Sequence, residues 1–274
     1  MGPADSSREE VGHAGAFELP HRYGPRVHVL DNVYLLSALA RIGSPNVAHR
    51  DLMALLRSVY QTLLMTACGR ELARVTGEVP TRMSAAHPAR GVYRGPVFDP
   101  AEQVVVVDVI RAGIVPSQVC FELLTAVLSE TSVRLDHLTM ARRSDEHGHV
   151  TGVDLSGSKI GGRVDGATLI LPDPMGATGI TTVRALRHYR EQWGRPKKIV
   201  ALPMIATPEY LRTVLEESPE LVVYTARIDR GMSDPDVLES LPGTYWDREK
   251  GLDAKSYIVP GAGGMGEVIN NSWC

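Results

Sequence analysis

The clearest chemical signal in the sequence is a nine-residue segment, Asp173-Pro174-Met175-Gly176-Ala177-Thr178-Gly179-Ile180-Thr181. It follows an apolar run and leads into a helical pattern, and the backbone N–H groups at a helix N-terminus bind anions such as phosphate. Gly179 lets the backbone approach such an anion, and the hydroxyls of Thr178 and Thr181 supply further donors. The carboxylate of Asp173 can accept hydrogen bonds from ribose hydroxyls. The segment therefore predicts a phosphate site, although a strand-to-helix turn capped by threonine explains the Thr-Gly pair equally well.

One arginine stands where an apolar run ends, so it can reach a bound anion. Arg111 follows residues 104–110. A guanidinium binds two phosphate oxygens at once and stabilises the charge that develops on a leaving group. Taken alone, an arginine at a strand end is more often a surface salt-bridge partner.

The elements that must position these residues alternate between strand and helix patterns. Strands are predicted for residues 104–110, 167–171, 198–205 and 221–225, and helices for residues 114–128, 178–193 and 208–217. This alternation predicts an α/β fold with a doubly wound parallel sheet. Such a sheet binds ligands at the carboxyl ends of its strands, where Arg111 and the segment that begins at Asp173 are expected.

The rest of the chain is interpreted as extensions of one domain. Residues 1–26 lack an apolar period and are predicted to form a flexible arm. Residues 27–76 show three- and four-residue apolar spacing, which predicts a helical arm of two helices separated at residues 43–46. Residues 77–100 predict small strands or hairpins. Residues 27–274 are thus expected to form a single domain. Within it, residues 257–274 form a tail too rich in glycine for regular structure.

Composition excludes several classes of protein. The chain has 274 residues and a formal net charge of -3, with no basic cluster that would indicate nucleic-acid binding. No apolar run approaches the ~20 residues that cross a bilayer. The three cysteines show no metal-ligand or paired spacing, which suits a reducing cytoplasm. We expect a cytoplasmic protein with neither nucleic-acid nor membrane partners.

Five segments, in order along the chain, resemble the uracil phosphoribosyltransferases, which are type I phosphoribosyltransferases. The segments are Ile110-Arg111-Ala112-Gly113, Arg142, Asp173-Pro174-Met175-Gly176-Ala177-Thr178-Gly179, Tyr224-Thr225-Ala226-Arg227-Ile228-Asp229-Arg230-Gly231 and Tyr257-Ile258-Val259-Pro260-Gly261. The likeness covers residues 28–233 and 256–270. It implies the doubly wound sheet of that family, with an N-terminal helical arm and a C-terminal hood.

The resemblance also implies roles for the matched residues. Phosphoribosyl pyrophosphate (PRPP) would be bound by Arg111, Arg142 and residues 173–181, with Asp173, Arg111 and Arg142 taking part in catalysis. Arg142 would belong to a flexible loop that closes over PRPP, and residues 143–149 after it have the polarity expected of a mobile lid that excludes water. The acceptor base would be bordered by five residues of the tail: Tyr257, Ile258, Gly263, Gly264 and Met265. The expected cofactor is Mg²⁺, held mainly by PRPP and water, so no protein ligand set is expected. The expected assembly is a homodimer or a higher homo-oligomer.

The tail departs from the family pattern, which makes the chain a divergent member with an altered base-binding tail. Gly264 stands where the family has its first tail aspartate, and Glu267 three residues later either substitutes for it in part or is solvated. Residues 234–256 are an insertion just before the tail. Its aromatic residues Tyr245 and Trp246 either stack on a larger ring or bury themselves against their own domain.

The resemblance predicts the transfer of a 5-phosphoribosyl group from PRPP to uracil or a related heterocyclic base. The products would be the nucleoside 5'-monophosphate, UMP in the case of uracil, and pyrophosphate. The altered tail leaves two alternatives open. One is a specialised phosphoribosyltransferase for an acceptor other than uracil. The other is a regulator that senses PRPP or nucleotides without turnover.

Overall fold

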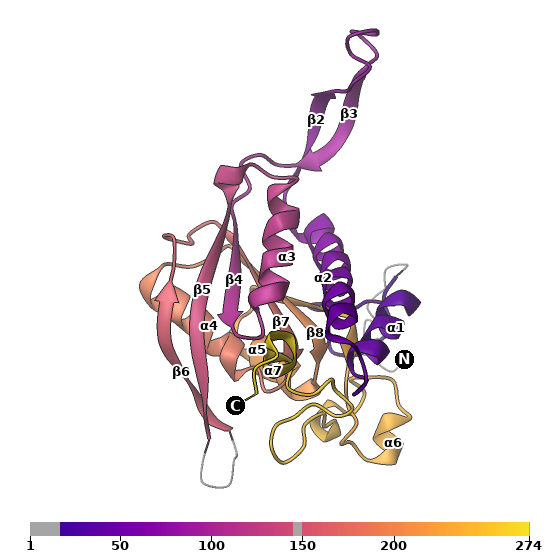
Figure 1. Cartoon of the computed structure of the whole chain (residues 1–274), viewed down its shortest axis with the longest axis vertical. Coiled ribbons are helices and arrows are strands. Elements are labelled where there is room, and N and C mark those ends of the chain that lie inside the picture. The colour runs from indigo at the N-terminus through magenta and orange to yellow at the C-terminus, as the bar shows by residue number, and fades with distance from the viewer. Residues whose placement is uncertain (1–16, 145–149, 274) are drawn as a thin grey trace, which may run out of the picture.

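A computed structural model describes residues 17–144 and 150–273. Its centre is an eight-stranded sheet (Figure 1). In order across the sheet, the strands are β1 (Val27–Val29), β9 (Leu221–Thr225), β8 (Lys198–Ala206), β7 (Thr168–Gly176), β4 (Val104–Ile110), β5 (Val133–Ser144) and β6 (Val150–Lys159), while β10 (Arg227–Ile228) pairs with β8. All the pairings are parallel except that of β6 with β5. The predicted parallel α/β sheet is confirmed.

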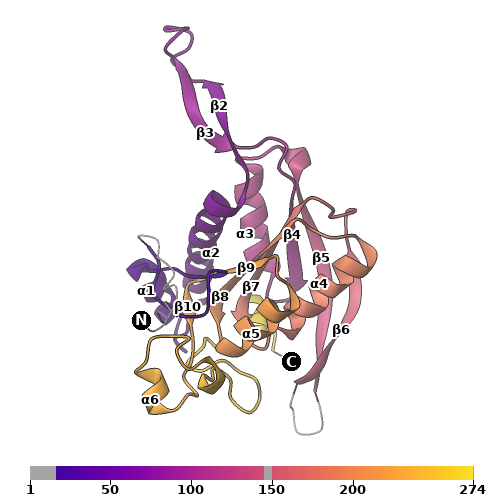
Figure 2. The ribbon, with the colours of Figure 1, turned by 180° about the vertical axis from the view of Figure 1, so that it is seen from behind.

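Helices cover both faces of the sheet, so the fold is doubly wound. One face carries α1 (Val33–Ile42), α2 (His49–Glu71) and α3 (Ile114–Thr125), which are nearest the viewer in Figure 1. The other face carries α4 (Ile180–Gln192) and α5 (Pro208–Glu217), as Figure 2 shows from behind. Each layer of helices closes its own hydrophobic core against the sheet. The central strands are therefore buried on both sides.

The central strands form where the sequence gives unbroken apolar runs. Every residue of β4 from Val104 to Asp108 is buried, and in β8 only Lys198 is partly exposed. Strands buried on both faces need apolar side chains at every position rather than at alternate ones. The apolar period of α2 differs, because a helix turns one face to the core: Leu52, Leu56, Val59 and Leu63 are fully buried at spacings of four, three and four residues.

A hairpin of β2 (Arg74–Pro80) and β3 (Val92–Phe98) extends from the body of the molecule (Figures 1 and 2). It confirms the hairpin predicted for residues 77–100. The two strands form a sheet of their own, and neither contains a fully buried residue. The hairpin therefore makes little contact with the rest of the described chain.

The structure corrects the sequence interpretation at both ends of the chain. Residues 17–26 do not form a loose arm: Tyr23 is only 3% exposed, and its hydroxyl donates a 2.5 Å hydrogen bond to Glu249. The prediction for residues 1–16 lies outside the described residues. Residues 27–29 form the edge strand β1 instead of starting a helix. The glycine-rich tail contains a short helix, α7 (Met265–Asn270), which the sequence analysis did not expect.

The insertion 234–256 folds against its own domain. It contains α6 (Pro235–Leu238) and a 3-10 helix, Trp246–Arg248. The Trp246 indole donates a 3.2 Å hydrogen bond to the Pro208 carbonyl and packs edge-on against Tyr23, with ring centroids 5.2 Å apart. The expectation that the aromatics of this segment pack on their own domain is confirmed for Trp246. Among the helices of the described residues, none is long and apolar enough to cross a membrane.

Candidate active site

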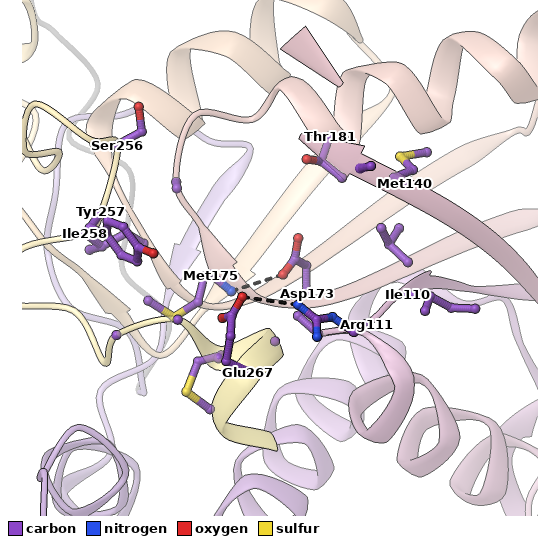
Figure 3. Close-up of a pocket in the computed structure, with 18 of the residues that line it drawn as sticks. Ile110, Arg111, Met140, Asp173, Met175, Thr181, Ser256, Tyr257, Ile258 and Glu267 are labelled. Atoms are coloured by element: carbon purple, nitrogen blue, oxygen red, sulfur yellow. Dashed lines mark hydrogen bonds and ion pairs between the residues drawn. The ribbon is translucent and has the colours of Figure 1, made fainter. Parts of the chain in front are cut away.

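A cavity of about 510 Å³ opens at the carboxyl ends of the central strands, where a doubly wound sheet binds its ligands. Four parts of the chain line it: the end of β4 with the loop after it, the end of β5, the end of β7 with the start of α4, and the tail. Figure 3 shows side chains from all four directed into the same space. Segments far apart in the sequence thus meet at one site.

Strand β7 continues into the predicted phosphate segment, and its alternation decides which residues reach the cavity. Asp173 and Met175 line the cavity, whereas Pro174 and Gly176 are buried on the other side of the strand. A Cβ on Gly176 would lie 2.9 Å from Pro203 Cβ and 3.1 Å from the Tyr210 ring. Glycine is therefore required at position 176 by packing against the opposite core, and its side-chain position does not face a ligand.

The part of the segment that can bind an anion is the start of α4. Gly179 precedes the helix with φ +79°, a left-handed conformation that favours glycine. The helix begins at Ile180, whose N–H donates to Thr178 Oγ1 at 3.4 Å, and Thr181 in its first turn lines the cavity. The first N–H groups of a helix have no partner within the helix, so this end attracts anions. Ala177 also lines the cavity, whereas the predicted residues Thr178, Gly179 and Ile180 are not among its lining residues, and Gly179 is buried against α5.

Asp173 is the acidic residue that lines the cavity from the end of β7. Its Oδ1 accepts a 3.2 Å hydrogen bond from the backbone N–H of Met175. The side chain is half-buried, and it borders the same cavity as Arg111 and Thr181. A carboxylate in this place can accept hydrogen bonds from the hydroxyls of a sugar whose phosphate lies at the start of α4.

Arg111 directly follows β4 and lines the same cavity as Asp173. The peptide between Ile110 and Arg111 is cis. The Arg111 guanidinium lies 3.3 Å from Glu267 Oε1 and donates a 3.2 Å hydrogen bond to the Ser272 carbonyl. Asn270 in turn donates a 3.3 Å hydrogen bond to the Arg111 carbonyl. The C-terminal tail therefore holds the arginine loop, residues 111–113, through both the backbone and the side chain of Arg111.

A polar pair of side chains, one buried and one partly exposed, lies next to the arginine loop. Asp108 in β4 is 2% exposed, and its Oδ2 lies 2.8 Å from Nδ1 of His137 in β5. Burial raises the pKa of Asp108, and the hydrogen bond to His137 opposes the rise. The pair joins β4 to β5 just before these strands reach the cavity, so it supports the site without lining it.

All five predicted base-binding residues line the cavity, together with Gly266 and Glu267 from the same tail and Ser256, the last residue of the insertion. Ile258 and Met265 are buried, whereas Tyr257 is 46% exposed. The tail is fixed to the sheet through Asp229, whose Oδ2 accepts a 2.7 Å hydrogen bond from the Gly261 N–H. The predicted tail and the predicted phosphate segment thus line the same cavity.

Arg142 differs from its prediction. It belongs to β5 rather than to the loop after it, since its backbone pairs with Val153 in β6. Residues 143 and 144 of the predicted lid also belong to β5, which pairs with β6 up to Ser144. The Arg142 side chain and residues 145–149, part of the predicted lid, lie outside the described residues.

The sequence analysis missed the contribution of β5 to the cavity. Thr139, Met140 and Ala141 line it beside Ile110, because the parallel register places Thr139 opposite Ile110. Their position just before Arg142 was the available signal. Tyr245 and Trp246 of the insertion are not among the lining residues of this cavity. The insertion therefore does not supply a stacking surface to the site in the described structure.

Comparison with known proteins agrees with this geometry. Residues 29–248 match the family model for uracil phosphoribosyltransferase. The uracil phosphoribosyltransferase of Thermococcus gammatolerans is 32% identical over 100 residues, which span 36% of this chain and 35% of that protein. The enzyme of the same name from Pyrobaculum arsenaticum is 27% identical over 241 residues, which span 88% of this chain and 97% of that protein.

A solved structure supports the same fold. A protein of Aquifex aeolicus superimposes with a TM-score of 0.67 at 20% identity, and the match covers 89% of this chain and 97% of that protein. The family model spans most of the chain, and the matched region includes both the Arg111 loop and the segment from Asp173 to Thr181. This chain belongs to the uracil phosphoribosyltransferase family and is a phosphoribosyltransferase.

Proposed function

We propose that the chain transfers a 5-phosphoribosyl group from PRPP to uracil or a related heterocyclic base, giving the nucleoside 5'-monophosphate and pyrophosphate. One observation carries the proposal. Arg111, Asp173 and the five predicted base-binding residues of the tail line a single cavity. That cavity holds a helix start that can bind an anion, a carboxylate for sugar hydroxyls and a half-buried tail, which are the parts that this transfer needs.

The reaction breaks the ribosyl C1–O bond, and its electron pair leaves with pyrophosphate. The acceptor nitrogen forms the new C1–N bond and releases its proton to water. Ribosyl transfer resembles glycoside cleavage in passing through an oxocarbenium-like state, so the site must orient the reactants and neutralise the leaving group. Arg111 suits the leaving pyrophosphate, Asp173 suits the ribose hydroxyls, and the first turn of α4 suits the 5-phosphate.

The cavity also fits the proposed Mg²⁺ cofactor. The carboxylates of Asp173 and Glu267 line it, and carboxylate oxygens are ligands that Mg²⁺ accepts. The described residues contain no group of three or more His, Cys, Asp or Glu that could hold a metal ion. We propose that the metal is held mainly by PRPP and water. When bound, it would offset negative charge on the pyrophosphate, which Arg111 alone does not balance in the described cavity.

A specialised acceptor other than uracil is the second candidate. The observation that favours it is the tail itself, where Gly264 and Glu267 replace the family arrangement and both line the cavity. A site that pairs polar groups with its substrate discriminates strongly through those groups. The transfer chemistry is the same in the two candidates, and they differ only in the ring that the tail accepts.

The test is to incubate the full chain with PRPP, Mg²⁺ and a panel of heterocyclic bases that includes uracil, and to separate nucleotide and pyrophosphate by chromatography. Uracil-dependent UMP supports the first candidate. A product from another base supports the second. Binding of PRPP without any nucleotide would contradict both and would favour a sensor.

Two substitutions connect this activity to the cavity. Arg111→Ala and Asp173→Asn are expected to lower turnover of PRPP by at least about 100-fold, since each removes a charged contact to the reacting sugar or its leaving group. The matched controls are Arg163→Ala and Asp247→Asn, whose side chains are largely exposed and lie outside the cavity lining. Unchanged rates in both cavity variants would remove the proposed site.

A further inference from the structure

The space beside Gly264 is already occupied. A Cβ on Gly264 would collide with Oε2 of Glu267 and would lie 3.3 Å from its Cδ. The same Cβ would be 3.9 Å from Cε1 of Tyr257. Gly264 and Glu267 both line the cavity. The Glu267 carboxylate therefore fills the place that any side chain at position 264 would take, next to the ring of Tyr257.

The start of α7 explains how residue 267 reaches that place. The N–H groups of Glu267 and Val268 both donate 3.1 Å hydrogen bonds to the Gly264 carbonyl. Residues three apart in a helical turn lie on the same side of it, so Glu267 stands directly over Gly264. A larger residue at position 264 would push this side chain away, and glycine at that position keeps the space open for it.

The two oxygens of Glu267 face different parts of the site. Oε1 lies 3.3 Å from the guanidinium of Arg111, on the side where pyrophosphate is expected. Oε2 lies on the side of Gly264 and Tyr257, where the base is expected. Figure 3 shows Glu267 between the labelled side chains of Arg111 and Tyr257. The Glu267 side chain is 30% exposed, so a ligand in the cavity can reach it.

We propose that Glu267 is the specificity-determining carboxylate of this site and that its Oε2 accepts a hydrogen bond from an N–H group of the acceptor ring. The inference rests on the proposed phosphoribosyl transfer and names the group that reads the acceptor. An ionised carboxylate only accepts hydrogen bonds, so it favours a ring with an N–H at this edge. It disfavours a ring that presents a carbonyl oxygen or a bare ring nitrogen there, because two acceptors would face each other.

The ion pair between Glu267 and Arg111 leads to a second expectation, which concerns PRPP binding. A guanidinium that already holds a carboxylate must give up part of that contact when it binds pyrophosphate. Removal of the Glu267 charge should therefore leave PRPP binding unchanged or tighter while it weakens use of the acceptor. A residue whose role was only structural would weaken both together.

The experiment uses the full chain with PRPP, Mg²⁺ and two sets of heterocycles, one with a ring N–H and one in which that N–H is methylated. The variants are Glu267→Gln, Glu267→Ala, Gly264→Asp and the double variant Gly264→Asp/Glu267→Ala. Glu191→Gln is the control, because Glu191 is exposed on α4 away from the cavity. Calorimetry measures PRPP binding, and steady-state kinetics measures kcat/KM for each acceptor.

Glu267→Gln and Glu267→Ala are expected to lower kcat/KM for N–H acceptors by about 10- to 100-fold, which is the effect of one hydrogen bond to a charged group. Gly264→Asp alone is expected to be similarly impaired, because two carboxylates compete for one space. The double variant is expected to recover at least about tenfold over Glu267→Ala, since aspartate at position 264 then has room to supply the carboxylate. Glu191→Gln should match the wild type.

Two results would overturn the inference while the proposed function stands. One is wild-type kinetics in Glu267→Gln with an acceptor that the wild type converts. The other is a double variant no better than Glu267→Ala. If the wild type binds PRPP but converts no acceptor, the proposed function fails, and calorimetric binding of the N–H heterocycle decides the inference. Weaker binding in Glu267→Gln then supports it, and equal binding or none overturns it.

Discussion

The carboxylate of Asp229 holds the backbone of Gly261 in place, with 2.7 Å between Oδ2 and the glycine nitrogen. The same carboxylate pairs with Arg227, whose Nη2 also lies 2.8 Å from Oδ2. Asp229 is 3% exposed, and Gly261 has φ +60°, at the bend that turns the tail toward the cavity. One buried carboxylate thus joins the sheet to the predicted base-binding tail.

Asp229→Asn should weaken use of the acceptor base more than it weakens binding of PRPP. The amide keeps the shape but loses the charge that Arg227 and the Gly261 N–H share, and a hydrogen bond to a charged group contributes about 1.5 to 3 kcal/mol. We expect KM for the acceptor to rise about tenfold or more while the Kd for PRPP changes little. Steady-state kinetics and calorimetry measure the two. Asp247→Asn, at a fully exposed position, is the control. An equal weakening of acceptor use and of PRPP binding would argue against a role specific to the tail.

Gly113→Ala should disturb the arginine loop. A Cβ on Gly113 would lie 2.8 Å from the backbone N and O of Val109 and 3.0 Å from Asp108 Oδ1, so the backbone has to move. Overpacking of this kind costs about 1 to 3 kcal/mol in stability. Because Arg111 is two residues away, we also expect weaker PRPP binding, measured by calorimetry.

Gly69→Ala provides the matched control for that substitution. Gly69 lies in α2, and a Cβ there meets nothing within 4 Å. Alanine in a helix interior is more stable than glycine by roughly 0.5 to 1 kcal/mol, so this variant should gain stability in urea unfolding and keep PRPP affinity. If both variants lost stability equally, the close approach at Gly113 would not be the cause.

Sequence reasoning succeeded where apolar pattern alone decides structure. The strand at Val104–Ile110 and the helix at Pro208–Glu217, with proline in its first turn, were predicted with their exact bounds. Strands β1 and β6 were missed because they lie at the edges of the sheet. β1 has only three residues, and β6 is polar and contains glycine. Their strand state depends on pairing with a neighbour rather than on local sequence.

The candidate site was also predicted only in part. The segment that begins at Asp173 and the tail were both predicted from their residues. Each supplies part of the cavity lining. The alternation that turns Pro174 and Gly176 away from it follows from the length of β7, which the apolar run before Asp173 does not determine. The contact between Glu267 and Arg111 joins residues 156 positions apart. Only the three-dimensional fold brings such a pair together.

The hairpin β2–β3 predicts self-association. Val79 lies directly opposite Tyr93 in its register, and these side chains are 48% and 45% exposed, with Val75 on the same face at 38%. A two-stranded hairpin is barely stable alone, and an exposed apolar face of this kind is typical of an interface. We expect a homodimer or larger homo-oligomer by light scattering. Val79→Lys with Tyr93→Lys should lower the mass, whereas Val127→Lys, at an exposed position in the body, should not. A wild-type monomer would contradict this expectation.

Glu71 at the end of α2 should give the fold a pH-dependent contribution. Its carboxylate lies 2.6 Å from Lys198 Nζ in β8 and accepts a 2.6 Å hydrogen bond from the Tyr224 hydroxyl in β9. Burial raises the pKa of Glu71, but the hydrogen bonds from Lys198 and Tyr224 outweigh burial, so its pKa lies below the ordinary value. A lowered pKa in the folded state means that the ionised carboxylate stabilises the fold.

That stabilisation is present in full above the pKa of the unfolded chain, about 4.3 for glutamate, and is lost as the pH falls through the lower folded-state pKa. Glu71→Gln should therefore lower the free energy of unfolding by roughly 1 to 3 kcal/mol at pH 7, and the deficit should shrink below about pH 4. Urea unfolding of both proteins across this range measures it, with exposed Glu191→Gln as the control. A deficit that stays constant down to pH 3 would instead assign the loss to packing, because a protonated glutamate and a glutamine differ little in charge.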